Sequence, residues 1–132
     1  MLKVLFPEIV FMSLLIMGCS GTTGLSIGKV SGVVTMDGQS LPQATVMFQP
    51  ALGRPSMGVT DDSGRYQLSY APGIEGATLG EHQVIIRTEI AGADGEPVQR
   101  KEMLPPRYNN NSELKATVLA GQNTCNFALS SK

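Results

Sequence analysis

Apolar and polar residues alternate along much of the chain after residue 29, with the period of two that a half-buried β-strand requires. Val46 and Phe48 fall on one face of such a segment, and Tyr66 and Leu68 fall on one face of another. No segment keeps apolar residues at helical spacing beyond a single turn. The pattern therefore predicts an all-β domain.

Polar turns and Gly-rich loops separate the predicted strands, which cover residues 29–36, 44–49, 58–60, 65–70, 82–88, 114–119 and 124–130. Asp37-Gly38 and the segment 61–64 are predicted to be tight turns, because Gly tolerates a positive φ and Asp bonds its own backbone. The near-continuous apolar centre of residues 82–88 predicts a central strand that is covered on both sides. About seven strands joined by such turns indicate an antiparallel sandwich or barrel.

Two polar loops are the best places for a binding site. Residues 91–97 form the most polar and Gly-rich loop and are expected to be the most mobile part of the domain. In residues 104–112 the prolines remove backbone donors and the Asn run favours turns, which argues against a helix or a central strand. We expect Tyr108 to be exposed there, and we identify Arg107, Tyr108 and Asn109 as possible ligand-facing residues.

The N-terminal segment has the pattern of a signal peptide. Lys3 is followed by a nearly uninterrupted apolar run over residues 9–17, which is too short to span a bilayer. Residues 15–19 (Leu-Ile-Met-Gly-Cys) then resemble the bacterial lipoprotein box. The resemblance implies cleavage before Cys19, diacylation of its thiol and acylation, such as by palmitate, of the new amino terminus. A plain secretory signal with Cys19 as a bystander and an uncleaved anchor are the alternatives.

A lipoprotein anchor would place the domain in the cell envelope. Several buried acyl chains, at about 0.8 kcal/mol per CH₂, hold a protein at a membrane much more firmly than one chain does. Ser20 follows the Cys, and in Gram-negative lipoproteins a residue other than Asp there favours the outer over the inner membrane. We therefore expect residues 1–18 to be a signal peptide, 19–28 a lipidated Cys and flexible tether, and 29–132 one domain in the periplasm or at the cell surface.

Composition limits the partners and the covalent chemistry. The 132 residues suffice for one domain, and the net charge of -1 gives no reason to expect nucleic acid as a partner. Cys19 and Cys125 do not suggest a disulfide framework, because the first lies in the N-terminal segment. Cys125 shares its face with Phe127 and Leu129, which predicts an inward-pointing thiol that behaves as a small hydrophobe.

Several motifs together resemble the carboxypeptidase regulatory-like domains. They are Val30-Ser-Gly-Val-Val34 with Asp37-Gly38, Leu41-Pro-Gln-Ala-Thr-Val-Met-Phe48, and Thr60-Asp61 with Gly64-Arg-Tyr-Gln-Leu68. The segment Leu104-Pro-Pro-Arg-Tyr-Asn109 is similar to small bacterial lipoproteins that carry this domain alone. The resemblance implies a transthyretin-like, seven-stranded antiparallel Greek-key sandwich. Members serve as accessory or binding modules, and the motifs fix turns and core positions rather than an activity.

No constellation of residues indicates a reaction. Asp37, Asp61, Asp62 and Asp94 could serve as Ca²⁺ ligands, but their spacing is not that of an EF-hand and turn formation accounts for them. His82 is the only histidine, so a zinc site or a Ser-His dyad would depend on it alone, and a structural role is the simpler interpretation.

Two further combinations of residues could indicate a crosslink or a sugar-binding face. A Lys29–Asn126 isopeptide crosslink is disfavoured because Asn126 has outward parity, and Tyr66, Tyr70 and Tyr108 are conceivable as a sugar-binding face. We predict a non-catalytic structural or protein-interaction module without a metal or cofactor. Its partner would be another envelope protein or a glycan, and a carbohydrate- or peptide-binding module is the alternative.

Overall fold

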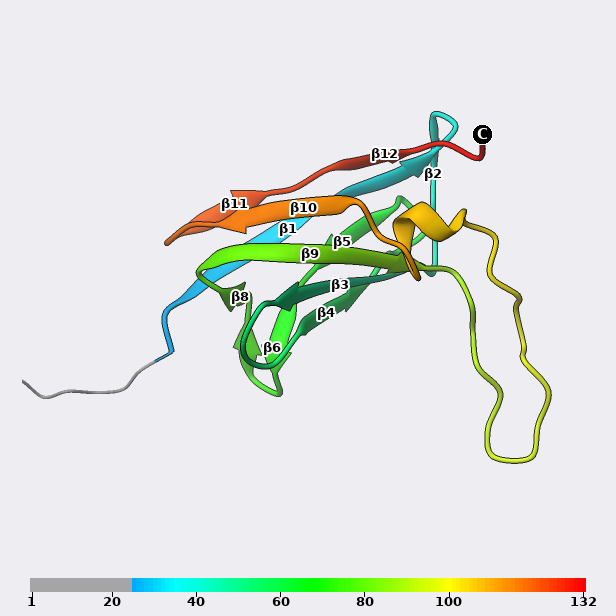
Figure 1. Cartoon of the computed structure of the whole chain (residues 1–132), viewed down its shortest axis with the longest axis horizontal. Coiled ribbons are helices and arrows are strands. Elements are labelled where there is room, and N and C mark those ends of the chain that lie inside the picture. The colour runs from blue at the N-terminus through cyan, green and yellow to red at the C-terminus, as the bar shows by residue number, and fades with distance from the viewer. Residues whose placement is uncertain (1–24) are drawn as a thin grey trace, which may run out of the picture.

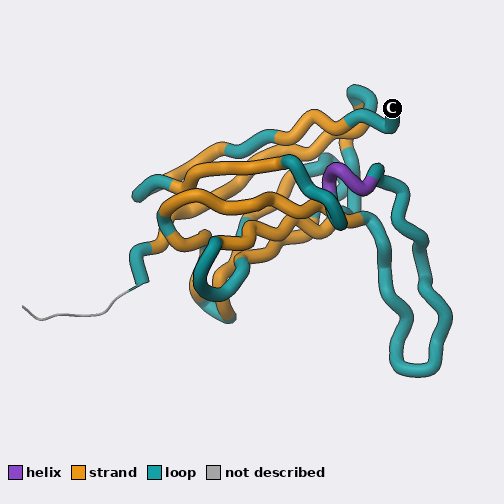
Figure 2. Tube along the Cα trace, viewed as in Figure 1, coloured by secondary structure: helices purple, strands orange, loops and turns teal. Residues whose placement is uncertain are grey.

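The computed structural model describes residues 25–132, so the predicted signal peptide, Cys19 and most of the predicted tether lie outside the described residues. The described chain is all-β, as the alternation predicted, and its strands form two sheets (Figures 1 and 2). No helix among residues 25–132 has the length and apolar character needed to cross a membrane.

The first sheet is built on the long strand β1 (Ile27–Met36). Its antiparallel partners are β2 (Gln39–Ser40), β5 (Arg65–Gln67) and β8 (Ala77–Thr78). Its parallel partners are β11 (Gln122–Thr124) and β12 (Phe127–Leu129). The predicted antiparallel pairing is confirmed for most strand pairs, and β11 and β12 are the exceptions. Side-chain alternation did not reveal them, because it reports which face is buried and not the direction of the neighbouring strand.

The second sheet is antiparallel throughout. Its order is β10 (Leu114–Val118), β9 (Gly80–Arg87), β3 (Thr45–Pro50), β4 (Ser56–Val59), β6 (Ser69–Ala71) and β7 (Ile74–Glu75). β9 is central as predicted, but the prediction that both of its faces are covered is wrong. Val84 and Ile86 are fully buried, whereas Ile85 between them points to the outer face and stays partly exposed.

The core lies between the two sheets and contains the residues that the alternation placed inside. Val46 and Phe48 contribute from β3, and the Phe127 ring meets the Phe48 ring edge-on with 6.2 Å between centroids. Each fully buried side chain of this kind stabilises the fold by roughly 1.5–3 kcal/mol. The full buried apolar set is Val30, Val34, Leu41, Ala44, Val46, Phe48, Tyr66, Leu68, Ala77, Val84, Ile86, Leu104, Tyr108, Val118 and Leu129.

Several strand boundaries differ from the sequence expectation. β1 begins at Ile27, which pairs with Thr78, so the predicted tether ends before residue 27. The predicted last strand is divided at residues 125–126, where the Val33 amide donates to Asn126 Oδ1 at 2.9 Å in place of a backbone partner. A 3₁₀ turn, η1 (Pro106–Tyr108), occurs where we excluded a helix, because proline is well suited to the first position of such a turn.

Both predicted tight turns are present. Asp37 and Gly38 adopt φ values of 51° and 82° between β1 and β2, as a two-residue hairpin requires. In the β4–β5 turn, Asp61 Oδ1 accepts the amides of Ser63 at 2.8 Å and Arg65 at 3.0 Å. This second turn connects the two sheets, because β4 belongs to one and β5 to the other.

The two ends of the sandwich carry different connections. Residue 25, where the described chain begins, lies at the end that holds the β10–β11 turn and the start of β9 (Figure 1). The C-terminus, η1 and a long loop at residues 89–101 lie at the opposite end (Figure 1). We call this loop the arm.

Candidate functional site

The three predicted ligand-facing residues turn out to hold the fold together. Tyr108 is only 9% exposed, and its hydroxyl accepts the amide of Ser130 at 2.9 Å. Arg107 lies with its guanidinium carbon 4.7 Å from the centre of the Tyr108 ring and donates to the carbonyls of Ser130 at 2.6 Å and Lys132 at 2.7 Å. The expectation that Tyr108 is exposed is wrong, because C-terminal residues cover it. These residues are far from Tyr108 in sequence, so the local pattern could not indicate the contact.

Asn109 is also buried, at the start of the connection from η1 to β10. Its Nδ2 donates to the carbonyl of Ile86 at 3.4 Å, and its Oδ1 accepts the amide of Asn110 at 2.8 Å. The Asn110 side chain in turn accepts from Arg87 at 3.0 Å. Asn109 and Asn110 therefore fasten this loop to β9, and the Asn109 side chain is used in the fold.

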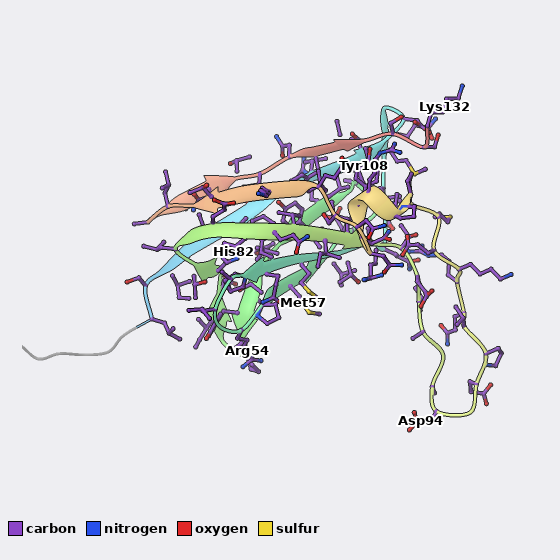
Figure 3. The ribbon with its side chains drawn as sticks, in the orientation of Figure 1. Arg54, Met57, His82, Asp94, Tyr108 and Lys132 are labelled. Atoms are coloured by element: carbon purple, nitrogen blue, oxygen red, sulfur yellow. The ribbon has the colours of Figure 1, made fainter. Side chains whose placement is uncertain are left out.

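The arm is the most prominent exposed element of the far end. Its two limbs meet in an isolated antiparallel bridge between Ile90 and Arg100. Beyond that bridge every side chain from Ala93 to Gln99 is exposed, and Asp94 lies at the tip (Figure 3). The tip is turned by a bond from the Glu96 amide to the Ala93 carbonyl at 2.7 Å.

A carboxylate fixes one limb of the arm to the sheet. Glu102 accepts the hydroxyl of Thr88 at 2.6 Å, the Thr88 amide at 3.0 Å and the Leu104 amide at 3.0 Å. Burial alone would raise the pKa of Glu102, but the hydrogen bonds from Thr88, Leu104 and Glu89 outweigh it and hold the pKa below its ordinary value. The carboxylate is thus stabilised in its charged form.

A guanidinium on the same returning limb adds a second attachment. Arg100 donates from Nε to the carbonyl of Thr88 at 2.6 Å and from a terminal nitrogen to the carbonyl of Gln43. The base of the arm is therefore tied to β9 and to the loop before β3. Neither Arg100 nor Glu102 was singled out in the sequence, because they lie in a segment without periodicity and their partners are distant.

A shallow groove of about 670 Å³ is a second candidate surface, on the outside of the sheet that contains β1. Its floor is Tyr66, whose hydroxyl donates to the carbonyl of Cys125 at 2.5 Å. Burial, followed by the proximity of Cys125, raises the pKa of Tyr66 well above its ordinary value. The groove is lined by Ser31, Gly32, Val33, Val59, Asp61, Arg65, Tyr66, Gln67, Thr124 and Asn126.

Beneath this groove, Gly32 allows the backbone of β1 to lie close to the Cys125 carbonyl and the Tyr66 ring. A Cβ at this position would lie 1.9 Å from the carbonyl oxygen of Cys125 and 3.0 Å from the Tyr66 ring. Cys125 itself points inward as predicted, but it is only partly buried. Burial raises the pKa of its thiol. Tyr66 is a core residue, as its spacing with Leu68 predicted.

The aspartates do not gather. Asp61 makes its turn, and Asp37 accepts the hydroxyl and the amide of Ser131 at 2.7 and 3.1 Å, which lowers its pKa. Asp94 lies at the arm tip. Among residues 25–132 no group of three or more His, Cys, Asp or Glu side chains is arranged to hold a metal ion.

His82 is a core residue. It is 1% exposed, its Nε2 lies 2.6 Å from the carbonyl of Thr78, and its ring is 5.7 Å from that of Phe48. Because a carbonyl only accepts, Nε2 carries the proton. Nδ1 and the hydroxyl of Ser56 are buried without a hydrogen-bond partner in the described structure.

The tyrosines do not form one face either. Tyr66 lies in the core, Tyr108 is covered by the C-terminus, and Tyr70 on β6 stacks against Arg54 with 5.7 Å from guanidinium carbon to ring centre. Lys29 and Asn126 are both exposed, which agrees with the outward parity of Asn126. Among residues 25–132 no single constellation of reactive side chains therefore stands out, and the arm and the groove are the candidate binding surfaces.

Comparisons with known proteins give little further information. No protein-family model and no curated protein matches the chain. Among solved structures, part of a 9R-lipoxygenase from Cyanothece PCC8801 is similar over 80% of this chain at 18% identity, with a TM-score of 0.42. This chain spans 16% of the length of that lipoxygenase. A similarity this weak carries no argument about function.

Proposed function

We propose that this protein is a non-catalytic, lipid-anchored β-sandwich of the bacterial envelope that binds another envelope component through the arm. The arm is the observation that carries the binding part of the proposal. Its base is fixed by Glu102 and Arg100, while its tip from Ala93 to Gln99 is exposed at the end far from residue 25. A displayed loop on a fixed scaffold is a common way to build a binding site.

The anchor part of the proposal is supported by sequence. The lipoprotein-like segment that ends at Cys19 lies shortly before Leu25, where the described chain begins. Acylation of Cys19 would hold that end of the sandwich close to the membrane and leave the arm on the distal side. Ser20 after the Cys supports localisation in the outer rather than the inner membrane.

We also propose that the fold is the transthyretin-like, seven-stranded Greek-key sandwich of the carboxypeptidase regulatory-like domains. The roles of the motif residues support this assignment. Thr60 donates to the carbonyl of Leu41 at 2.6 Å and accepts the amide of Ala44 at 2.8 Å. A Cβ at Gly64, where φ is 75°, would lie 2.4 Å from the carbonyl of Val34. The motif at residues 60–68 thus contacts residues 30–34 and 41–48, which are the other two motifs of the family pattern.

A crosslinking pull-down from native membranes tests the function. Three chains are compared: wild type, Cys19→Ala, and a variant in which residues 91–98 are replaced by a short Gly/Ser turn while Thr88, Arg100 and Glu102 are kept. We expect a specific partner with the wild type, less of it with Cys19→Ala, and none with the shortened arm. Equal recovery by the wild type and the shortened arm would refute the arm as the binding element.

A carbohydrate- or peptide-binding module is the second candidate, and the groove favours it. Arg65, Gln67 and Asn126 present amide and guanidinium donors around the groove. Binding to a glycan or peptide array that Gln67→Ala abolishes, but that the shortened arm leaves unchanged, would support this alternative. Gln67 is exposed, so its replacement leaves the core intact.

A further inference from the structure

Exposed aliphatic side chains gather at the end of the sandwich where the described chain begins. Five of the nine exposed large apolar side chains of residues 25–132 lie there. We call them the N-terminal rim: Leu25 (58% exposed), Leu52 (91%), Ile74 (43%), Leu79 (40%) and Leu119 (65%). None of the five belongs to the buried core.

Backbone contacts bring four of these residues around the start of β1. The Leu79 amide donates to the carbonyl of Ser26 at 3.1 Å, beside Leu25. A Cβ at Gly28 would lie 2.2 Å from the carbonyl of Leu119, and one at Gly76, next to β7, would lie 2.2 Å from the carbonyl of Gly28. The four come from separate segments of the chain and are brought together only by the fold.

Leu52 extends the rim along the same end of the second sheet. It lies in the β3–β4 connection, which begins after Pro50, and Pro50 pairs with His82 near the start of β9. Figure 3 shows Arg54 of this connection on the side away from Asp94 at the arm tip. The rim therefore follows the turn tips of both sheets.

Charge at the rim is nearly balanced. Lys115 and Glu81 form an ion pair at 3.6 Å, and Glu75 accepts a bond from Gln67 at 2.8 Å. Two further cations near the rim are Lys29, which lines a pocket with Ile74, and Arg54, which follows Leu52 by two residues. A surface of this kind makes contact through apolar side chains, and a strong electrostatic attraction to anionic lipid is not expected.

We propose that the N-terminal rim is a lipid-contacting surface, whose aliphatic tips enter the headgroup region of the bilayer that holds the anchor. The inference rests on the proposed anchor at Cys19. The stretch between Cys19 and Leu25 reaches at most about 20 Å when fully extended, so this end of the domain stays beside the membrane. Several partly inserted side chains then orient the sandwich with the arm pointing away from the lipid.

Single tryptophans test the rim directly, because the chain contains no Trp. Leu52→Trp and Leu119→Trp report on the rim, and Val98→Trp, an exposed aliphatic site on the arm, is the matched control. Each acylated full chain is reconstituted into phosphatidylcholine vesicles with and without bromine on the acyl chains. We expect emission from the two rim positions to be quenched about twofold or more, because interfacial side chains lie about 5–10 Å deep, and no quenching at Val98→Trp.

The outcomes separate the rim from the anchor. The rim proposal would be overturned if, on chains that float with the vesicles, the rim tryptophans were quenched no more than Val98→Trp. A blue shift of rim emission without quenching would also overturn it, because it indicates contact with protein and not with lipid. Intact mass reports acylation of Cys19 independently. If no acyl group is present, the anchor fails, and the rim is tested by coupling the Cys19 thiol to a maleimide lipid in a Cys125→Ser background. Quenching that requires anionic lipid would contradict an apolar contact.

Discussion

The two ends of this sandwich differ in the side chains that their connections carry. At the N-terminal rim, short turns expose aliphatic side chains such as Leu52 and Leu119. At the far end, the connections are fixed by polar side chains, among them Thr60 and Glu102, whose oxygens take up backbone amides. Polar groups that order a loop are needed where a surface must keep its shape in water, whereas exposed aliphatic residues suit a surface that contacts something apolar.

The largest expected effect comes from removing a buried hydroxyl at the far end. Thr60→Val keeps the shape of the side chain but leaves the Leu41 carbonyl and the Ala44 amide without their partner. We expect the free energy of unfolding to fall by about 2 kcal/mol in urea denaturation. Thr117→Val, at an exposed position on β10, is the control and should change it by less than about 0.5 kcal/mol. Equal effects at the two sites would show that the Thr60 bonds are unimportant.

A smaller loss is expected at the base of the arm. Glu102→Gln retains the shape but replaces a carboxylate that accepts bonds from Thr88 and Leu104. Because this group is partly exposed to solvent, we expect the loss to be about 1 kcal/mol, at the low end for bonds to charged groups. Hydrogen exchange should become faster at residues 89–101 in particular. Unchanged exchange in the arm would indicate that Glu102 does not fix it.

The same carboxylate gives the far end a pH dependence. The pKa of Glu102 is lowered in the fold, so its contribution to stability is fully present above the ordinary pKa of an unfolded Glu and is lost as the pH falls through the folded value. Unfolding midpoints measured between neutral pH and pH 3 should therefore decline less steeply at the acid end for Glu102→Gln than for the wild type. Parallel curves would contradict the assigned hydrogen bonds.

The smallest effect on stability is expected at the rim. Leu52 is 91% exposed and contributes little to the core, so Leu52→Ser should change the free energy of unfolding by no more than about 0.5 kcal/mol. A loss above about 1 kcal/mol would mean that Leu52 packs against the fold, and the rim would then be a structural feature. Thermal unfolding followed by circular dichroism measures this difference.

Local features of the fold were predictable from sequence because they depend on neighbouring residues. The alternation around Val46 and Phe48 identified the buried face of β3, and the Asp37-Gly38 dipeptide identified a hairpin. The parallel pairing of β1 with β12 was not predictable, since residues such as Val34 and Phe127 are far apart in sequence and alternation does not encode strand direction.

The candidate site was harder to predict for the same reason. Tyr108 lies in a Pro- and Asn-rich loop, which suggested exposure, yet Ser130, which is remote in sequence, covers it together with the neighbouring Arg107 side chain. The fixed base of the arm depends on Glu102 and Arg100 reaching Thr88 and, in one case, Gln43. The sequence did indicate that residues 91–97 form a polar loop, but it did not indicate the hydrogen bonds that fix the base of the arm.

Photo-crosslinking from both ends of the same anchored protein tests whether the rim contacts lipid while the arm contacts a protein. A photoreactive amino acid is placed at Leu52 on the rim or at Val98 on the arm, and the chain is irradiated in native membranes. We expect lipid adducts from residue 52 and a discrete protein adduct from residue 98. Lipid adducts from residue 98, or the same protein adduct from both positions, would contradict this expectation.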